Sequence, residues 1–212
     1  MAEISANAVK ELRERSGAGF MDCKRALQAT EGDVAKAVDW LREKGLAAAA
    51  KKADRVASEG AVVSYIHPGG RMGVLVELNC ETDFVARTDE FQALGRDLAM
   101  QVAAARPTWV RRDEVPAEVL EHEREVLRRQ ALAEGKPERI IEQMVEGRLR
   151  KFYAENCLLD QSFIRDADRT VEARVQEAIA RLGENIVPRR FARFQLGETE
   201  PKAPETVGTA QA

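Results

Sequence analysis

Residues 60–80, GAVVSYIHPGGRMGVLVELNC, contain two runs rich in β-branched residues, separated by a proline and two glycines. A Pro-Gly-Gly turn supplies the positive φ angles that a tight hairpin loop needs. In the second run, Val74, Val76 and Leu78 occupy alternate positions, so at least one face of that strand is buried. The stretch predicts an antiparallel β-hairpin. Because the segments around it have mostly helical patterns, we expect an α+β fold with an antiparallel sheet and packed helices.

The first 45 residues have the pattern of a small helical module. In DVAKAVDWLREKG, residues 33–45, apolar residues recur with helical spacing, an aspartate suited to cap a helix comes first, and a glycine suited to end one comes last. Two shorter helical segments lie upstream, separated by Gly17 and Gly19. We therefore expect a three-helix module over residues 1–45. The alanine-rich residues 46–58 are good helix formers and predict a helical linker.

The rest of the chain predicts more helices and at least one more strand. Residues 116–155 contain two long helical patterns separated by EGKPER, which places a glycine after the first helix and a proline at the start of the second. This pattern predicts an antiparallel helical hairpin within an α+β core domain over residues 59–196. Residues 197–212 have no apolar periodicity, so a disordered tail is expected there.

Composition and charge argue against several classes of protein. The chain has 33 basic and 36 acidic residues, interleaved along its length, and a formal net charge of −3. It lacks the one-sided positive field that phosphate backbones require, so nucleic acid is not expected as a direct partner. Its apolar runs are far shorter than the roughly 18 residues that span a membrane, and its N-terminus has no apolar signal-peptide core. We expect a cytoplasmic protein.

The sequence contains no recognisable catalytic motif, whether for phosphate binding, a nucleophilic serine or a zinc hydrolase. The spacing of its cysteines matches no zinc site, and reduced thiols are expected at Cys23, Cys80 and Cys157. Cys80 is a formal candidate for a nucleophile, yet no histidine partner is evident and a cysteine at the end of a buried strand is usually a core residue. His67 and His122 are isolated. We expect a binding protein, without a cofactor, a metal site or catalytic residues.

The segment NCETDFVARTDEF, residues 79–91, places an acid and an aromatic residue side by side where a strand gives way to a helix. Thr82, Asp83 and Thr88 are all candidates for helix N-caps. Phe84 at such a corner is usually a core residue. The pair Asp83 and Phe84 fits equally well a protruding wedge, whose ring enters an apolar pocket of a partner while the carboxylate acts on a polar site beside it.

Five blocks of the sequence together resemble the translation elongation factor Ts family. In chain order they are VKELRERSGAGFMDCKRAL (9–27), NCETDFVA (79–86), EGKP (134–137), EGRLRKF (146–152) and RRFARFQLGE (189–198). The resemblance extends from residue 2 to about residue 198. It implies a guanine-nucleotide exchange factor that binds GDP-bound elongation factor Tu and releases GDP by disturbing the Mg²⁺ and phosphate site.

The same resemblance implies roles for two groups of residues. The N-terminal module is similar to ubiquitin-associated domains and would dock on the nucleotide-binding domain of elongation factor Tu, through Gly17, Gly19, Phe20, Met21 and Asp22. Displacement of Mg²⁺ in the partner is associated with the T-D-F-V motif, here Thr82, Asp83, Phe84 and Val85. Longer members have two related sheet subdomains, but this chain has room for one. The resemblance therefore implies a homodimer within an assembly of two Ts and two Tu chains.

Two other interpretations stay open on the sequence alone. A ubiquitin-associated-like adaptor would capture a peptide with residues 1–45 and have no exchange activity, but it makes no use of the T-D-F-V motif. An RNA-binding accessory factor would rely on Arg189, Arg190 and Arg193. Those arginines are also typical of the solvated face of an edge strand.

Overall fold

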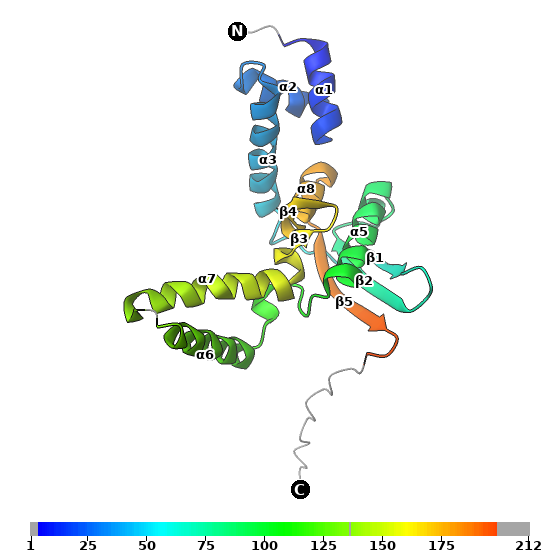
Figure 1. Ribbon diagram of the computed structural model, residues 1–212. Coiled ribbons are helices and arrows are strands. Elements are labelled where there is room, and N and C mark those ends of the chain that lie inside the picture. Colours follow the sequence, from blue (N-terminus) through cyan, green and yellow to red (C-terminus); the bar gives the residue numbers. More distant parts are fainter. Residues whose placement is uncertain (1–3, 136, 199–212) are drawn as a thin grey trace.

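The computed structural model describes residues 4–135 and 137–198. Figure 1 shows an N-terminal helical module, a central body that contains the sheet, and a helical hairpin that projects from the body to one side. The expected α+β fold, with N-terminal helices and a small antiparallel sheet, is confirmed. The tail predicted for 197–212 lies outside the described residues, apart from its first two positions.

Three helices form the N-terminal module: α1 (Ala6–Ser16), α2 (Phe20–Ala29) and α3 (Val34–Ala50). Asp33 caps α3, as predicted, because its Oδ1 accepts a hydrogen bond from the Lys36 amide at 3.0 Å. Gly17 ends α1 in the left-handed conformation, with φ of 65°. The module has a core of its own, made of Val9, Leu12, Cys23, Ala26, Leu27 and Ala37.

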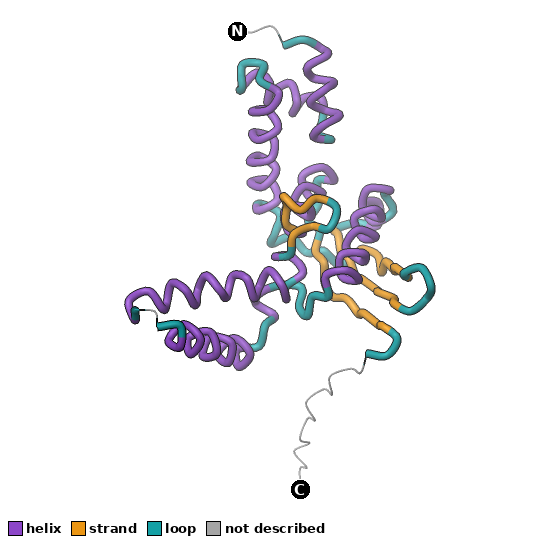
Figure 2. The backbone as a smooth tube through the Cα atoms, viewed as in Figure 1, coloured by secondary structure: helices purple, strands orange, loops and turns teal. Residues whose placement is uncertain are grey.

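The prediction that Gly45 ends a helix is wrong, because α3 continues to Ala50. Gly45 lies where α3 packs against α8 (Val171–Leu182), and a Cβ added to it would lie 3.3 Å from the Cβ of Ala180. The glycine therefore permits close approach of two helices. The helical linker predicted for 46–58 is helical only over its first part, as the end of α3, and turns follow. Figure 2 shows α3 running without a break from the module to the body.

The body contains a three-stranded antiparallel sheet in the order β1, β2, β5. Its strands are β1 (Glu59–Ile66), β2 (Met72–Cys80) and β5 (Val187–Gln195). The predicted hairpin is confirmed, and Gly69 and Gly70 in its turn have φ of 91° and 67°. A smaller two-stranded ribbon consists of β3 (Ser162–Phe163) and β4 (Asp166–Thr170).

Helices cover one face of the sheet and form the main core with it. They are α4 (Asp83–Ala86), α5 (Asp89–Ala105) and α8. The alternate side chains of β2 point into this core, as the sequence predicted, and are buried: Val74, Val76, Leu78 and Cys80. Gln101 of α5 is a buried polar residue, and its amide nitrogen donates to Gln161 Oε1 at 3.1 Å. Because this amide is satisfied, its burial is tolerated.

The projecting hairpin consists of α6 (Ala117–Ala133) and α7 (Glu138–Asn156), as the sequence predicted. Its helices share a small apolar seam made of Leu127, Ala131, Ile141, Val145 and Leu149. Ion pairs join the exposed flanks, with Arg124 at 2.8 Å from Glu146. Short 3₁₀ turns, Arg112–Glu114 and Leu158–Asp160, lie where the hairpin joins the body.

Gly60 is a position where the fold requires glycine. It has φ of 146°, and a Cβ built on it would lie 2.2 Å from the carbonyl oxygen of Leu78 in the paired strand. Gly60→Ala is expected to lower the free energy of unfolding by about 3 kcal/mol, from backbone strain and the clash. Urea unfolding followed by circular dichroism measures this change.

Gly147 offers a control of opposite sign. It lies on the exposed side of α7, and a Cβ there would have no neighbour within 4 Å. Gly147→Ala should raise the free energy of unfolding by about 0.5–1 kcal/mol, because alanine is the better helix former. A wild-type unfolding midpoint for Gly60→Ala would contradict the close approach of β1 and β2.

Candidate functional site

Two threonines shape the corner between β2 and α5. Thr82 precedes α4, and its Oγ1 accepts a hydrogen bond from the Val85 amide at 3.4 Å. Thr88 precedes α5, accepts from the Phe91 amide at 3.3 Å and donates to the Val85 carbonyl at 2.8 Å. Both threonines are therefore N-caps, as the sequence allowed. Between them, α4 has only four residues, and its direction depends on these caps.

The third cap candidate, Asp83, has a different role in the structure. It is the first residue of α4, and its Oδ2 lies 2.8 Å from Nη2 of Arg87. The Arg87 side chain is 80% exposed and that of Asp83 is 46% exposed, so this ion pair contributes little to stability. Asp83 can therefore exchange Arg87 for a partner's polar groups at small cost.

Phe84 points away from the protein, which excludes the alternative that it is a core residue. Its side chain is 81% exposed, while the neighbouring Val85 packs against the main core and Ala86 is buried. The short helix α4 thus turns its aromatic residue outward and its aliphatic residues inward. The corner presents a single ring on a backbone that is capped at both ends.

The N-terminal candidates also form an exposed surface. Phe20 and Met21, at the start of α2, are 53% and 60% exposed. Asp22 forms an ion pair with Arg25 at 2.7 Å. Gly19 is the N-cap position of α2 and provides no side-chain cap. Two apolar side chains therefore stand beside one carboxylate, a composition similar to that of the Phe84 corner.

The two candidate surfaces are connected through the end of α8. A Cβ added to Gly17 would lie 3.0 Å from Nη1 of Arg181, so the turn between α1 and α2 lies close to this guanidinium. The same nitrogen lies 3.3 Å from Oε1 of Glu90, in the first turn of α5. The structure thus brings the N-terminal candidates and the Phe84 corner to the same end of the body. Their separation in the sequence gave no sign of this arrangement.

The remaining candidates for chemistry have structural roles. Cys80 is buried, donates to the Thr82 carbonyl at 3.1 Å and has its pKa raised to about 11, mainly by burial. Burial likewise raises the pKa of the Cys157 thiol to about 11. Both cysteines therefore stay protonated at neutral pH and are poor nucleophiles. Within 4–135 and 137–198, no group of three or more His, Cys, Asp or Glu residues is placed to hold a metal ion.

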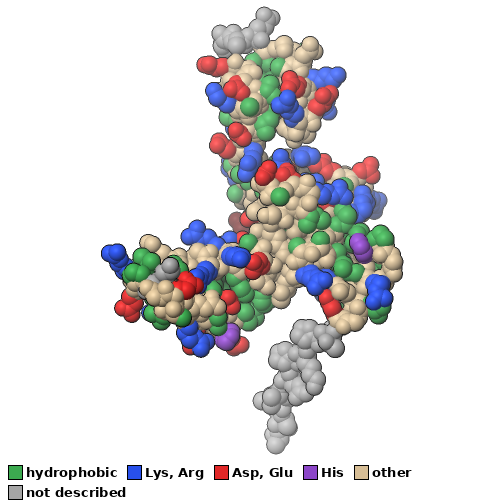
Figure 3. All heavy atoms as spheres, viewed as in Figure 1, with side chains coloured by type: hydrophobic (Ala, Val, Ile, Leu, Met, Phe, Trp, Pro, Cys, Tyr) green, Lys and Arg blue, Asp and Glu red, His purple; other side chains and the backbone are tan. Residues whose placement is uncertain are grey.

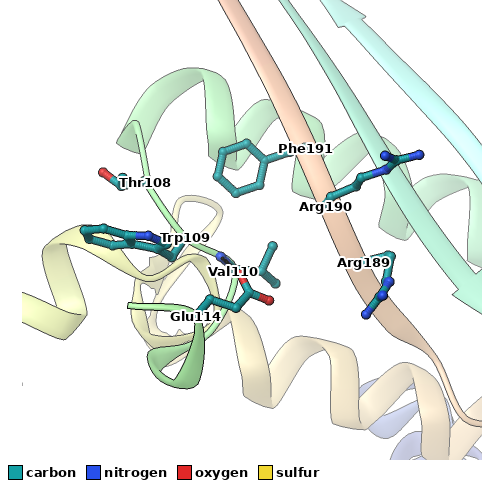
Figure 4. A pocket seen from close by; sticks show the side chains of 7 residues that line it. All are labelled: Thr108, Trp109, Val110, Glu114, Arg189, Arg190 and Phe191. Carbon is teal, nitrogen blue, oxygen red and sulfur yellow. Dashed lines mark hydrogen bonds between the residues drawn. The ribbon is translucent and has the colours of Figure 1, made fainter. Parts of the chain in front are cut away.

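The arginines of β5 lie among acidic side chains. Arg190 Nε lies 2.6 Å from Glu77 Oε2, and Arg193 is only 11% exposed and pairs with Glu198. A hollow of about 380 Å³ lies beside Arg189 and Arg190, but a carboxylate also lines it, as Figure 4 shows for Glu114. Its lining residues are Thr108, Trp109, Val110, Glu114, Arg189, Arg190 and Phe191. This mixed charge favours the interpretation of a solvated edge strand over an RNA surface.

The surface as a whole is mixed in charge too. In Figure 3, acidic and basic side chains are interspersed over the module and the hairpin on the face in view. Among the described residues, no helix combines the length and apolar character needed to cross a membrane.

The sheet face away from the helices carries a set of exposed apolar side chains that sequence reasoning did not single out. Val62 and Ile66 on β1 are 68% and 64% exposed, Leu75 on β2 is 45% exposed and Phe194 on β5 is 59% exposed. The strand register places Ser64 opposite Leu75 and Gly73 opposite Phe194, so all belong to one face. We call these four residues the outer sheet face. The alternation of β2 was the available signal, since Leu75 lies between two buried valines.

The family model described as Elongation factor TS matches residues 6–198, almost all of the described chain. The chain belongs to the elongation factor Ts family. Elongation factor Ts of Desulforamulus reducens is 63% identical over 198 residues, which cover 93% of this chain and 91% of the relative. Those of Heliobacterium modesticaldum and Thermoanaerobacter sp. are each 64% identical over 195 residues, 92% of this chain and 91% and 96% of the relatives. The resemblance found in the five sequence blocks is confirmed, and it makes the chain a translation elongation factor.

Proposed function

We propose that this member of the elongation factor Ts family is a guanine-nucleotide exchange factor, which binds elongation factor Tu in its GDP-bound form and promotes GDP release. The observation that carries the proposal is the 81% exposure of Phe84 on a corner capped at both ends, within the T-D-F-V motif. Burial of that ring in a partner would contribute about 1.5–3 kcal/mol. Nucleotide exchange on elongation factor Tu is the family's role.

The mechanism needs no catalytic group on this chain. GTPases hold GDP through a backbone cradle around the β-phosphate, a lysine and a Mg²⁺ ion. Mg²⁺ demands short bonds in octahedral geometry, so a shift of about 1 Å in a neighbouring helix weakens it strongly. Phe84 would insert between elements of the nucleotide domain and cause such a shift. Asp83, whose Arg87 partner is largely exposed, would compete for polar contacts beside the ring.

The N-terminal module would supply a second contact with the nucleotide-binding domain. Phe20 and Met21 provide the exposed apolar anchors, and Asp22 lies beside them. Gly17 and Gly19 bracket the turn that presents these residues. A ubiquitin-associated-like adaptor would use this surface alone and would leave the exposed Phe84 without a role.

Thermodynamic linkage sets a condition on this exchange. If the chain weakens GDP binding about a thousandfold, a coupling of about 4 kcal/mol, then GDP weakens the binding of this chain to elongation factor Tu by the same factor. Either nucleotide can therefore expel the exchange factor. The direction of exchange then follows from the supply of GTP, which requires no further device on this chain.

The outer sheet face would pair two copies of the chain within an assembly of two Ts and two Tu chains. Its support is the set of exposed apolar side chains at Val62, Ile66, Leu75 and Phe194, which all lie on one face. Two such faces can pack as a sandwich about 10 Å apart. A two-fold axis would place the same residues on both sides of the interface.

Stopped-flow release of a fluorescent GDP analogue from elongation factor Tu tests the proposed function. The loaded Tu is mixed with an excess of unlabelled nucleotide, with or without this chain. We expect the chain to accelerate release by at least 100-fold at saturation, and GDP to lower its affinity for Tu in a parallel titration. Release that proceeds at the intrinsic rate at every concentration of the chain would contradict the proposal.

A further inference from the structure

We propose that Glu184 is the positioning residue of the Phe84 corner, and that the segment Arg181–Asn185, which spans the last residues of α8 and the turn after it, holds this corner and the N-terminal module in one fixed relation. The inference rests on the proposed function, because it takes Phe84 as the residue that acts on elongation factor Tu. Glu184 itself is not expected to touch the partner's nucleotide site. It acts through the backbone that carries the ring.

Glu184 binds the first residues of the corner through three hydrogen bonds. Its Oε2 accepts from the amides of Glu81 and Thr82 at 3.1 and 3.0 Å, and its Oε1 accepts from the Thr82 hydroxyl at 2.6 Å. Because the hydroxyl proton of Thr82 is directed at Glu184, an oxygen lone pair is left for the Val85 amide. Glu184 therefore sets the orientation of the cap that begins α4, and with it the direction of Phe84.

A second hydrogen bond joins the same two segments, with the carboxylate on the corner and the amide on the segment after α8. Oε1 of Glu81 accepts from the Asn185 amide at 2.7 Å. The side-chain nitrogen of Asn185 donates to the carbonyls of Arg55 at 2.8 Å and Ala53 at 3.2 Å, just after α3 ends. Asn185 is 4% exposed, so these bonds lie in a setting where loss of a partner is costly. Two neighbouring residues thus join the corner to the segment that follows α3.

Arg181 extends the arrangement to the N-terminal module. Its guanidinium lies close to Gly17 and pairs with Glu90 on α5. The preceding residue, Ala180, packs against Gly45 on α3. Residues 180–185 therefore lie next to the module, α3, the corner and the first turn of α5.

The position of residues 180–185 matters because the proposed exchange needs two contacts with elongation factor Tu at a fixed separation, one through Phe84 and one through the N-terminal module. If both surfaces are held in place before binding, no ordering free energy is lost when Phe84 enters the partner. A loosened corner would still bind elongation factor Tu through the module, but the ring would act on the metal site less often. The expected signature is a lower maximal rate of GDP release at an unchanged half-saturating concentration.

Glu184→Ala in the full chain is the first test. It removes the acceptor of three hydrogen bonds and leaves the Glu81 and Thr82 amides without their partner. We expect the maximal rate of stimulated GDP release to fall about 10-fold, while the half-saturating concentration changes less than about twofold. Glu184→Gln keeps one carbonyl oxygen and the same shape, so it should recover most of the rate.

A double-mutant cycle with Phe84→Ala separates the two proposals. If Glu184 acts through Phe84, adding Glu184→Ala to Phe84→Ala should slow release less than about twofold further. Multiplicative effects of the two changes would overturn the inference and leave the proposed function standing, as would a wild-type rate for Glu184→Ala. A wild-type rate for Phe84→Ala alone would overturn the proposed function, and the inference with it.

A second variant and a control guard against simple loss of folding. Thr82→Val removes only the hydroxyl bond to Glu184 and the cap to Val85, and should lower the maximal rate about three- to tenfold. A wild-type rate for this variant also counts against the inference, even if Glu184→Ala does not fold. The matched control is Asp97→Ala, which removes from α5 a 13% exposed carboxylate that pairs with Arg165 in the turn between β3 and β4. It should leave both kinetic parameters unchanged; a similar fall in its maximal rate would mean that general destabilisation explains the result.

Discussion

Phe84→Ala is expected to lower the maximal rate of GDP release from elongation factor Tu about 10- to 100-fold. The ring is 81% exposed, so its removal leaves the chain's own core intact. Its transfer into a partner's apolar pocket contributes about 1.5–3 kcal/mol, which corresponds to that range of rates if the contact forms only as the nucleotide site opens. Stopped-flow release of fluorescent GDP at saturating concentrations of the variant measures the effect.

Two comparisons make the result specific. Ile164→Ala truncates another exposed apolar side chain, 45% exposed in the turn between β3 and β4, and should release GDP at the wild-type rate. The thermal unfolding midpoint of Phe84→Ala should equal that of the wild type. An undiminished release rate for Phe84→Ala would show that the ring does not act on the nucleotide site.

Leu75→Glu is expected to dissociate the proposed dimer. Leu75 lies on the central strand, opposite Ser64 on one side and Ala192 on the other, so it is at the middle of the outer sheet face. In a two-fold interface the change buries two carboxylates without partners, at a cost of several kcal/mol. The dissociation constant should rise by about a thousandfold or more. Sedimentation velocity over a concentration series measures it.

Leu132→Glu serves as the control for this prediction. Leu132 is 50% exposed on α6, so the change adds the same charge to an exposed leucine of the hairpin. It should leave the sedimentation coefficient unchanged. A wild-type protein that sediments as a monomer at all concentrations, or a Leu75→Glu variant that remains dimeric, would contradict pairing through the outer sheet face.

Features that depend on neighbours in the sequence were predicted correctly. The turn between β1 and β2 follows from Pro68 and two glycines, and the cap of α3 follows from Asp33. Gly45 was misinterpreted because a glycine that ends a helix and one that allows close packing look alike locally. What distinguishes them is Ala180, which is 135 positions away.

The candidate site was predictable in its residues but not in its geometry. A helix of four residues is too short for periodicity to show which side chain faces out, so the sequence left Phe84 open between core and surface. Thr82 and Asp83 were equally good caps by type, and only the structure shows that Thr82 holds the position. Glu184 could not be found from the sequence, because its contact with Thr82 spans 102 residues and an acid after a helix is common.

The continuity of α3 has a consequence for how this protein could diverge. Because α3 continues from the N-terminal module into the body, a change in its length both rotates and shifts the module relative to the body. One inserted residue between Asp39 and Gly45 would turn the module by about 100° and advance it by about 1.5 Å. An insertion or deletion in α3 would therefore change the position of the module relative to the body without any change at the residues of either surface.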